Sequence, residues 1–397
     1  MSSNSLDKAT IAVWGGETAH EPYERATQVP VVHSVSFGYH DLDTWRAVAI
    51  GEQPGHIYSR NTNPTVRALE EKLRDLEGAE AATSFSTGMA AISGTFFALL
   101  RPGDRVVSIK DSYGGTNKLF TEFLPAFGIE VRLCDTTDHE QLEAEITRGC
   151  TMLYLETPTN PTVKIVDIER LAKAAHRAGA LVVVDNTFAT PINQNPRQLG
   201  ADLVLHSATK FLGGHADALG GAACGSQALI QKLYHFREIN GATLSPADAY
   251  LLLRGMKTLG LRIERQNESA MTIARWLQQQ PIVEQVNYPG LASHVHHDVA
   301  ARQMRGFGGV LSFSVRGGLD AIKVFLPRLR LAHRAANLGC VETVVGPPLL
   351  TSHVECSDAE RAAAGIPDGL IRYSTGIEHA SDLIADLDQA LASISVR

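Results

Sequence analysis

Residues 201–210 read Ala-Asp-Leu-Val-Leu-His-Ser-Ala-Thr-Lys, an apolar, strand-like run that leads into two hydroxyl side chains and a lysine. A lone ammonium at the end of a buried strand is costly unless it has a function. A bound aldehyde cofactor supplies one, because an imine removes the free ammonium and the hydroxyls of Ser207 and Thr209 can hold a phosphate. Pyridoxal phosphate has this chemistry. The sequence therefore predicts that Lys210 carries this cofactor; the alternative is a surface lysine in a glycine-rich loop.

A second apolar run, residues 181–184, ends in Asp185-Asn186-Thr187. A strand that is apolar throughout suits a parallel sheet buried on both faces. Open sheets of this kind bind ligands at the carboxyl ends of their strands. A carboxylate there would keep a pyridine ring protonated, so that the ring can accept electrons. We expect Asp185 to have this role; the alternative is a cap of the turn that follows.

Composition indicates an ordinary globular enzyme of more than one domain. The chain has 397 residues, of which 44% are hydrophobic and 20% charged, with a formal net charge of −7. Because the charge is spread out, we expect neither a nucleic-acid-binding stripe nor a membrane-binding segment. The first residues lack the apolar core of a signal peptide, and the apolar stretches are too short to span a bilayer. The cysteines are scattered, which favours reduced thiols and a cytoplasmic location.

Strand-like and helical segments alternate through the middle of the chain. The expected elements are, in order, a helix from Asn63-Pro64-Thr65 to Gly78, strands at 105–109, 130–133 and 152–155, a helix at 168–178, and strands at 181–184 and 201–206. This alternation favours an α/β fold with a mostly parallel, doubly wound sheet.

The segments before and after this region have a different character. Residues 1–60 lack periodicity and are expected to form an extended arm. A long helical run over 249–276 leads to shorter strand-like segments and to a final helix from Ala380. We therefore expect an arm (1–60), a large cofactor-binding domain (61–250) and a smaller C-terminal α/β domain (251–397).

Two motifs carry groups suited to a phosphate. Residues 84–92 look like a loop that enters a helix, whose first N–H groups would form an anion site; the alternative is a plain N-cap. Tyr58 and Arg60 place a phenol close to a guanidinium, which binds phosphate through two hydrogen bonds; the alternative is a solvated pair on the arm.

Three further residues suit the cofactor ring and the substrate. Tyr113, on a glycine-flanked turn, is suited to stack on the ring and to exchange a proton. Asn160, in a proline-containing loop, is suited to donate to the phenolic oxygen of the cofactor. Arg372 follows an apolar pair and is suited to bind a carboxylate. The alternatives are an ordinary turn tyrosine, a stiffened loop and a surface cation.

A histidine cluster raises the question of a metal. His294, His296 and His297 lie close together, with Asp298 as the adjacent acid. We expect no metal site, because the sequence around these histidines offers no acidic residue other than Asp298 to complete a set of ligands.

Together these residues resemble the Cys/Met-metabolism group of fold-type I pyridoxal-phosphate enzymes. The group includes cystathionine γ-synthase, cystathionine γ- and β-lyases, methionine γ-lyase and O-acetylhomoserine sulfhydrylase. The resemblance covers nearly the whole chain, and its markers are Tyr58-Ser59-Arg60-Asn61, Ser86-x-Gly88-Met89-Ala90-Ala91, Tyr113-Gly114-Gly115-Thr116, Glu156-x-Pro158-x-Asn160-Pro161, Val184-Asp185-Asn186-Thr187, Ser207-Ala208-Thr209-Lys210 and Arg372-Tyr373-Ser374-x-Gly376-Ile377-Glu378.

The resemblance implies roles that agree with the interpretation of the single residues. Lys210 would form the Schiff base with the cofactor and move protons, and Asp185 would pair with the pyridinium nitrogen, with Thr187 beside it. The phosphate would be held by Gly88, Met89, Ser207 and Thr209.

The resemblance also implies an assembly with shared active sites. Tyr58 and Arg60 would reach into the phosphate site of a neighbouring subunit, so that the arm contacts that subunit and a dimer is the minimal catalytic unit. Members commonly form tetramers, as dimers of dimers. Tyr113 would stack on the ring and act as acid and base, and Arg372 would bind the α-carboxylate of the substrate.

The segment that sets substrate choice departs from the family pattern. Cystathionine-handling members usually have Glu-Ser-Leu-Gly-Gly where this chain has Ala336-Asn337-Leu338-Gly339-Cys340. Without the glutamate, cystathionine is in doubt. Methionine γ-lyases usually carry a cysteine where this chain has Gly115, which weakens a methionine assignment. Ser352 replaces the usual threonine, and we expect Asn337 and Ser352 to contact the substrate together with Arg372.

The resemblance implies γ-elimination or γ-replacement on a four-carbon L-amino acid with a γ-leaving group. O-activated homoserine, methionine-like thioethers and a specialised γ-heteroatom amino acid all stay open as substrates. A non-catalytic scaffold is disfavoured because Lys210, Asp185, Tyr113 and Arg372 are all retained. A nicotinamide-dependent dehydrogenase is disfavoured because the Gly-x-Gly-x-x-Gly fingerprint does not occur.

Overall fold

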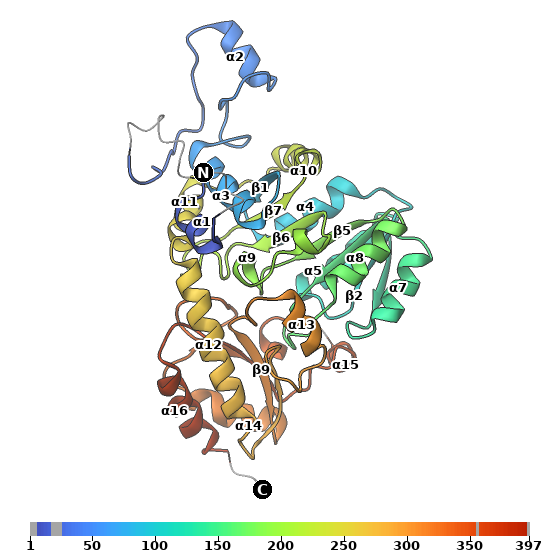
Figure 1. The fold of residues 1–397 in the computed structure, drawn as a ribbon, viewed down its shortest axis with the longest axis vertical. Helices are drawn as coiled ribbons and strands as arrows, with labels where there is room; N and C mark the ends of the chain where they lie inside the picture. Colours follow the sequence, from blue (N-terminus) through green and yellow to red (C-terminus); the bar gives the residue numbers. More distant parts are fainter. Residues whose placement is uncertain (1–5, 17–25, 355–356, 395–397) are drawn as a thin grey trace.

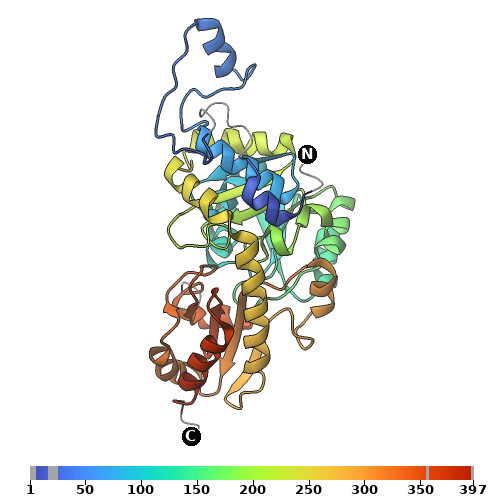
Figure 2. The ribbon, with the colours of Figure 1, turned by 60° about the vertical axis from the view of Figure 1, so that its left-hand side comes forward.

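The computed structural model describes residues 6–16, 26–354 and 357–394. Within them, a large sheet and a smaller sheet lie toward opposite ends of the molecule, and the long helix α12 (Leu259–Leu277) runs from one to the other (Figures 1 and 2). The segment that carries helix α2 (Leu42–Ala49) projects away from the large-sheet end in both views.

The large sheet has seven strands in the described residues, in the order β1-β7-β6-β5-β4-β2-β3. Strand β7 pairs antiparallel with β1 and β6, and the other neighbours are parallel. The prediction of a mostly parallel sheet is confirmed. The strands are β1 (Ala81–Phe85), β2 (Arg105–Ile109), β3 (Glu130–Cys134), β4 (Met152–Glu156), β5 (Leu181–Asp185), β6 (Leu203–Ser207) and β7 (Gly221–Gly225).

Helices cover both faces of this sheet, which is why its central strands are apolar throughout. On β5, Val183 packs in a cluster with residues of α4 and α10, whereas Val182 and Val184 pack on the opposite face with residues of α7 and α8. The helices of this part are α1 (Lys8–Trp14), α3 (Pro64–Glu77), α4 (Gly88–Leu99), α5 (Gly114–Lys118), α6 (Leu124–Ala126), α7 (His139–Thr147), α8 (Ile168–Arg177), α9 (Thr190–Asn193), α10 (Gln227–Asn240) and α11 (Pro246–Met256).

The smaller sheet has five strands in the described residues, in the order β10-β11-β12-β9-β8. Its apolar side chains form one cluster with those of α12, α14 and α16. The elements are β8 (Val283–Asn287), α13 (His297–Gln303), β9 (Val310–Val315), α14 (Gly318–Phe325), β10 (His333–Arg334), β11 (Val344–Gly346), α15 (Asp358–Ala363), β12 (Leu370–Ser374) and α16 (Ala380–Leu391).

The helix expected to run without interruption over 249–276 is divided, so that prediction is wrong in part. Helix α11 ends at Met256 and α12 begins at Leu259. The backbone turns where Gly255 packs against the loop that follows Lys210: a Cβ on Gly255 would lie 2.0 Å from the carbonyl oxygen of Gly213. Arg262, in the first turns of α12, donates to the carbonyl of Phe211 at 2.8 Å. The break therefore brings both helices against the lysine-bearing loop.

The N-terminal region is less extended than its sequence suggests. Helix α1 is capped by Asp7, whose side chain accepts from the N–H of Ala9, and it packs on α3 and α12 through the buried Ile11 and Ala12. Such a short amphipathic segment gives no clear periodicity. The division of the chain at residues 60 and 250 stays a prediction.

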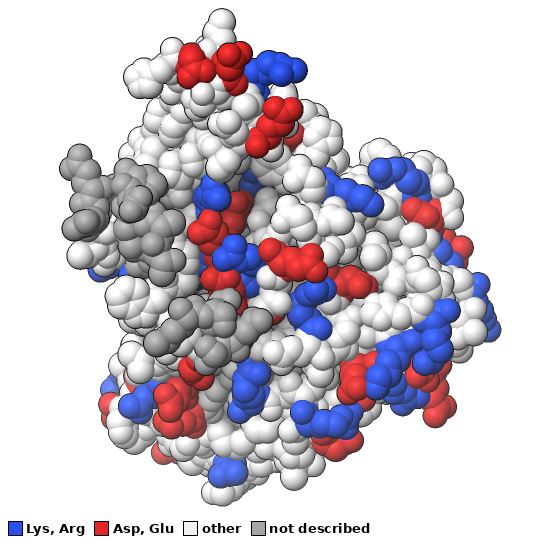
Figure 3. All heavy atoms as spheres, turned by 45° about the horizontal axis from the view of Figure 1, so that its top comes forward, with Lys and Arg blue, Asp and Glu red and all other residues white. Residues whose placement is uncertain are grey.

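The surface carries charges of both signs. On the face shown in Figure 3, Lys and Arg side chains lie interspersed with Asp and Glu. Among the helices in the described ranges, none combines the length and apolar character needed to cross a bilayer.

Candidate active site

A cavity of about 270 Å³ lies where the carboxyl ends of β4, β5 and β6 meet the N-terminus of α4, and residues near the smaller sheet line its other side. Most residues predicted from the sequence line this cavity, although they come from distant parts of the chain. They are Gly88, Met89, Tyr113, Asn160, Asp185, Thr187, Ser207, Thr209, Lys210, Ser352 and Arg372.

Lys210 lies in the turn that follows β6, where its backbone N–H donates to the carbonyl of Ser207 at 3.1 Å. Its side chain is largely buried and donates from Nζ to Oδ1 of Asn337 at 2.8 Å. Burial lowers the pKa of Lys210 to about 8, and the positive charge of Arg372 adds to this shift. At pH 7 about a tenth of the amine is therefore neutral and nucleophilic, far more than at the ordinary lysine pKa of about 10.4.

Asp185 ends β5 and is buried beneath the cavity. Its Oδ1 accepts from the N–H of Thr187 at 2.9 Å, and its Oδ2 accepts from the hydroxyl of Tyr154 at 3.4 Å. Burial raises the pKa of this carboxyl, and the hydrogen bonds from Thr187 oppose the rise. Within the described ranges it forms no ion pair, so the site has a buried acid that a cationic ring nitrogen would satisfy.

The N-terminus of α4 provides an anion site at one end of the cavity. Thr87 caps the helix by accepting from the N–H of Ala90 at 3.0 Å. The N–H groups of the first turn, which includes Gly88 and Met89, have no partners within the helix, and the helix dipole favours a negative charge beside them. Ser207 and Thr209 line the same cavity, so the predicted phosphate residues are brought together.

Glu156 connects two loops of the site, and the sequence analysis assigned it no role. Its Oε2 accepts from the N–H of Tyr113 at 2.8 Å, and its Oε1 accepts from the N–H of Asn160 at 3.2 Å. Burial, together with the nearby charge of Asp185, raises the pKa of Glu156 well above its ordinary value. The available signal was its position: it ends a buried strand in register with Asp185.

Arg372 lies on β12 and is buried. It donates to Oδ1 of Asn160 and to the carbonyl of Asn337, both at 3.1 Å. Burial lowers the pKa of Arg372 to about 10, which leaves it protonated at neutral pH. Because Asn160 accepts through its oxygen, its amide nitrogen is the group left to donate to a ligand.

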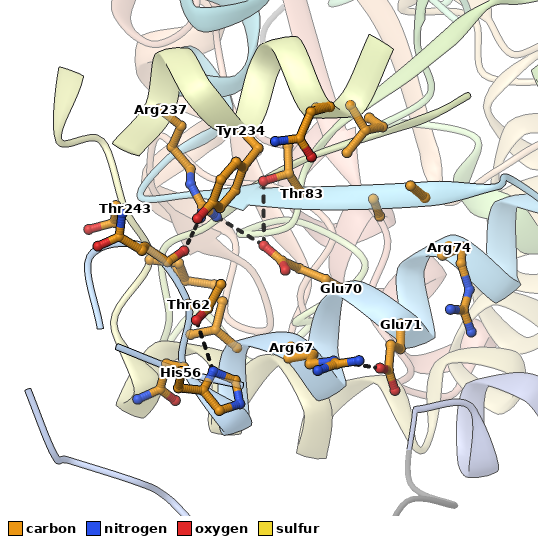
Figure 4. A pocket seen from close by; sticks show the side chains of 18 of the residues that line it. His56, Thr62, Arg67, Glu70, Glu71, Arg74, Thr83, Tyr234, Arg237 and Thr243 are labelled. Atoms are coloured by element: carbon orange, nitrogen blue, oxygen red, sulfur yellow. Dashed lines mark hydrogen bonds and ion pairs between the residues drawn. The ribbon is translucent and has the colours of Figure 1, made fainter. Parts of the chain in front are cut away.

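Tyr58 and Arg60 do not line this cavity. The guanidinium of Arg60 lies 5.7 Å from the ring centre of Tyr58 and donates to the carbonyl of Glu238. Arg60 instead lines a second cavity, of about 290 Å³, between the end of the arm, α3 and α10 (Figure 4).

Other residues that line the first cavity were not assigned from the sequence. Thr87 had a recognisable signal, since a threonine before a helix is a common cap. The apolar members carry no such signal because apolar side chains are common everywhere. The unassigned residues are Thr87, Ile92, Glu156, Phe188, Leu219, Leu338 and Thr351.

The histidine cluster binds backbone rather than forming a shared site. His294, His296 and His297 donate to the carbonyls of Val163, Ile165 and Pro289 at 2.9, 3.0 and 2.8 Å, respectively. In the part of the chain that the structure describes, no three His, Cys, Asp or Glu residues gather in a way that would hold a metal.

The groups of the first cavity match the parts of pyridoxal phosphate. The cavity offers an amine whose pKa is about 8, a buried carboxyl that no cation pairs with in the described residues, and a helix N-terminus with neighbouring hydroxyls. An aldehyde, a ring nitrogen and a phosphate are the respective partners of these groups.

Comparison with known proteins gives the same family. The profile described as "Cys/Met metabolism PLP-dependent enzyme" matches residues 9–392. The chain is 43% identical over 364 residues to L-methionine γ-lyase of Pseudomonas putida, covering 91% of this chain and 92% of that protein. It is 42% identical over 390 residues to cystathionine γ-lyase of Bacillus subtilis, covering 98% of this chain and 100% of that protein. The crystal structure of cystathionine γ-synthase from Xanthomonas oryzae pv. oryzae in complex with cystathionine matches with a TM-score of 0.93, at 39% identity over 98% of both chains. This chain therefore belongs to the Cys/Met metabolism family of pyridoxal-phosphate-dependent enzymes.

Proposed function

We propose that this enzyme catalyses γ-elimination or γ-replacement on a four-carbon L-amino acid that carries a leaving group on its γ-carbon. The observation that carries the proposal is the meeting of Lys210, Asp185 and Arg372 around one cavity. The proposal agrees with its relatives, which include L-methionine γ-lyase, cystathionine γ-lyase and O-succinylhomoserine sulfhydrylase.

The cofactor is pyridoxal phosphate, which when bound withdraws electrons from the α-carbon of the substrate. Lys210 would hold it covalently, and Asp185, oriented by the N–H of Thr187, would face its ring nitrogen. The residues that would hold the phosphate are Gly88, Met89, Ser207 and Thr209, and Asn160 would donate to the phenolic oxygen.

The proton transfers are assigned to Lys210 and Tyr113. The amine of Lys210, with a pKa of about 8, is suited to take the α-proton of the substrate and to return it. Tyr113 would stack on the ring and protonate the leaving group. Tyr113 lines the cavity and is 40% exposed, and its loop is fixed by the hydrogen bond from its N–H to Glu156.

Arg372 would bind the α-carboxylate of the substrate. Two of its N–H groups donate to Asn160 and Asn337, which fixes the plane of the guanidinium, and other N–H groups of the five remain for a ligand. Asn337 and Ser352 would contact the substrate beside it. A buried, fixed arginine is the side chain best suited to a planar carboxylate.

The substrate itself is assigned only as a class. Ala336 lines the cavity at the position where cystathionine-handling members usually have a glutamate. This observation speaks against cystathionine and so supports a second candidate function, γ-elimination from methionine or from a specialised γ-heteroatom amino acid. Of these two, methionine is the less favoured, because Gly115 stands where methionine γ-lyases usually have a cysteine.

We also propose that active sites are shared between subunits of a dimer of dimers. The arm exposes large apolar side chains, among them Val35, Leu42 and Trp45, which a neighbouring subunit would cover. Tyr58 and Arg60, which lie away from the cavity of their own chain, would reach the phosphate of the neighbour.

The proposed compartment is the reducing cytoplasm. Cys134, Cys150, Cys224 and Cys340 are free thiols, as expected where disulfides do not form.

One experiment tests the proposed reaction. Purified enzyme is incubated with a panel of γ-substituted L-amino acids, with and without added thiol, and 2-oxobutyrate and new thioethers are measured. Keto acid without thiol would identify elimination, and thioether that forms only with thiol would identify replacement. Formation of pyruvate would mean that a β-bond breaks and would contradict the proposal.

A further inference from the structure

The second cavity contains an ion pair that links the end of the arm to the body of the large sheet. Arg237 on α10 and Glu70 on α3 lie on opposite sides of this cavity, and the two side chains point toward each other (Figure 4). Nη1 of Arg237 donates to Oε1 of Glu70 at 3.0 Å. The side chain of Arg237 is only 3% exposed and that of Glu70 is 20% exposed, so the guanidinium in particular is withdrawn from water.

We propose that the Glu70–Arg237 ion pair positions residues 58–61, and so sets how tightly a neighbouring subunit holds its cofactor. This inference rests on the proposed function, which places Tyr58 and Arg60 at the phosphate of the neighbour. Glu70 and Arg237 act in it as positioning residues, because neither lines the cavity around Lys210.

On the arm side, helix α10, which carries Arg237, binds two successive residues of the arm, Arg60 and Asn61. Nη2 of Arg237 donates to the carbonyl of Asn61 at 2.6 Å. Next to it, the carboxylate of Glu238 accepts from the amide of Asn61, and the carbonyl of Glu238 accepts from the guanidinium of Arg60. The direction of Arg60 therefore depends on where this end of α10 lies.

On the body side, the pair is fixed to β1. Nη1 of Arg237 also donates to the carbonyl of Ser84 at 3.0 Å. The N–H and the hydroxyl of Ser84 each donate to Oε1 of Glu70 at 2.8 Å. Strand β1 runs on into Thr87, the cap of the anion site of its own chain. One buried unit thus joins the phosphate site of one chain to the segment expected to reach the site of the next.

Removal of one partner should release the arm segment. A guanidinium left buried without its carboxylate is strongly unfavourable, so Arg237 would move toward other acceptors and give up the carbonyl of Asn61. Arg60 would then sample several directions, and the neighbour would bind phosphate with less pre-organisation.

The test compares cofactor affinity in Glu70→Gln, Arg60→Ala, the double variant and the wild type. Each holoenzyme is dialysed against decreasing concentrations of pyridoxal phosphate, and the bound fraction is read from the absorbance of the cofactor. Glu71→Gln is the matched control, since Glu71 follows Glu70 on the same helix but pairs at 3.0 Å with Arg67, which is 54% exposed.

Glu70→Gln is expected to weaken cofactor binding about tenfold, and Glu71→Gln to leave it unchanged. In the Arg60→Ala background, Glu70→Gln should have little further effect, because its action passes through Arg60. Equal effects in both backgrounds, or no effect of Glu70→Gln, would overturn this inference. If Arg60→Ala itself leaves the affinity unchanged, the proposed function is wrong about Arg60. Should Glu70→Gln not fold, Asn61→Ala, which removes the side-chain contact to Glu238, takes its place in the same cycle.

Discussion

The side chains of Lys210 and Asn337 form a 2.8 Å hydrogen bond between Nζ and Oδ1. Lys210 lies in the turn after β6 of the large sheet, which ends at Ser207, whereas Asn337 belongs to the loop between β10 and β11 of the smaller sheet. The amine that we propose to be reactive is therefore in contact with the segment in which this chain departs from the family pattern. Any change at Asn337 should alter both the lysine and the substrate pocket.

We expect Asn337→Asp to raise the pKa of Lys210 and Asn337→Ala to lower it. A carboxylate beside Nζ stabilises the ammonium, and loss of the amide oxygen removes its acceptor. Since the neutral amine attacks the aldehyde, the rate of cofactor uptake by cofactor-free enzyme should rise with pH through a midpoint of about 8 in the wild type. The midpoint should move upward by about 1 unit or more in Asn337→Asp. Asn240→Asp, on an exposed part of α10, is the control, and coincident profiles would contradict the assignment.

Arg372→Lys should impair substrate binding while the cofactor stays bound. Lysine keeps the charge but lacks the planar fork, and it cannot replace the two hydrogen bonds to Asn160 and Asn337. We expect kcat/KM to fall about 10- to 100-fold, mainly through KM. Steady-state kinetics and the cofactor absorbance check this together; loss of the cofactor band would show that Arg372 has another role.

Glu156→Gln should lower kcat, because one glutamine amide cannot accept from both loops. Either the N–H of Tyr113 or that of Asn160 would face an NH₂ group, at a cost of about 1–3 kcal/mol. If the misplaced loop is that of Tyr113, kcat should fall about tenfold or more, with a smaller change in KM. Glu169→Gln, which alters an exposed pair with Lys173, is the control. A lower Tm with unchanged kcat would mean that Glu156 only stabilises the fold.

Asp185→Asn should lower the activity of the enzyme but raise the stability of the cofactor-free protein. Burial raises the pKa of Asp185, so in the cofactor-free protein the ionised carboxylate destabilises the fold once the pH exceeds its ordinary value of about 3.9. The variant should therefore unfold at a higher urea concentration at pH 7, with a gain that shrinks as the pH falls toward about 4 and disappears below that value. Its activity should fall by about 100- to 1,000-fold, because the ring nitrogen loses its anionic partner. Equal urea midpoints for the two cofactor-free proteins would contradict the electrostatic part of this account.

The sequence predicts best those strands that are buried on both faces and those helices whose ends carry clear signals. Strands β2, β4 and β5 are apolar because both of their faces are covered, and helix α3 carries clear signals at Asn63, which caps it, and at Gly78, which ends it in a left-handed conformation. Strand β7 was missed because its sequence, Gly-Ala-Ala-Cys-Gly, consists of small residues. The structure gives the reason: a Cβ on Gly221 would lie 2.0 Å from the carbonyl oxygen of Thr87, so the anion loop needs that space.

Most of the predicted site residues have chemically distinctive side chains, whereas Gly88 and Met89 were predicted from a motif that resembles the family. Residues that act through others, such as Glu156 and Glu70, were missed because an acidic residue on a strand or helix has many ordinary explanations. Their partners are distant in the sequence: Glu70 meets Arg237, and Glu156 meets Tyr113. Only the folded chain identifies such pairs.

The most direct test of the central claim is to locate the cofactor on the chain. The purified enzyme is reduced with borohydride and digested, and the cofactor-labelled peptide is sequenced by mass spectrometry, with Lys210→Ala as the control. The account predicts a reduced pyridoxyl group on Lys210 in the wild type and none in the variant. A label on a different lysine, or one that persists in Lys210→Ala, would contradict it.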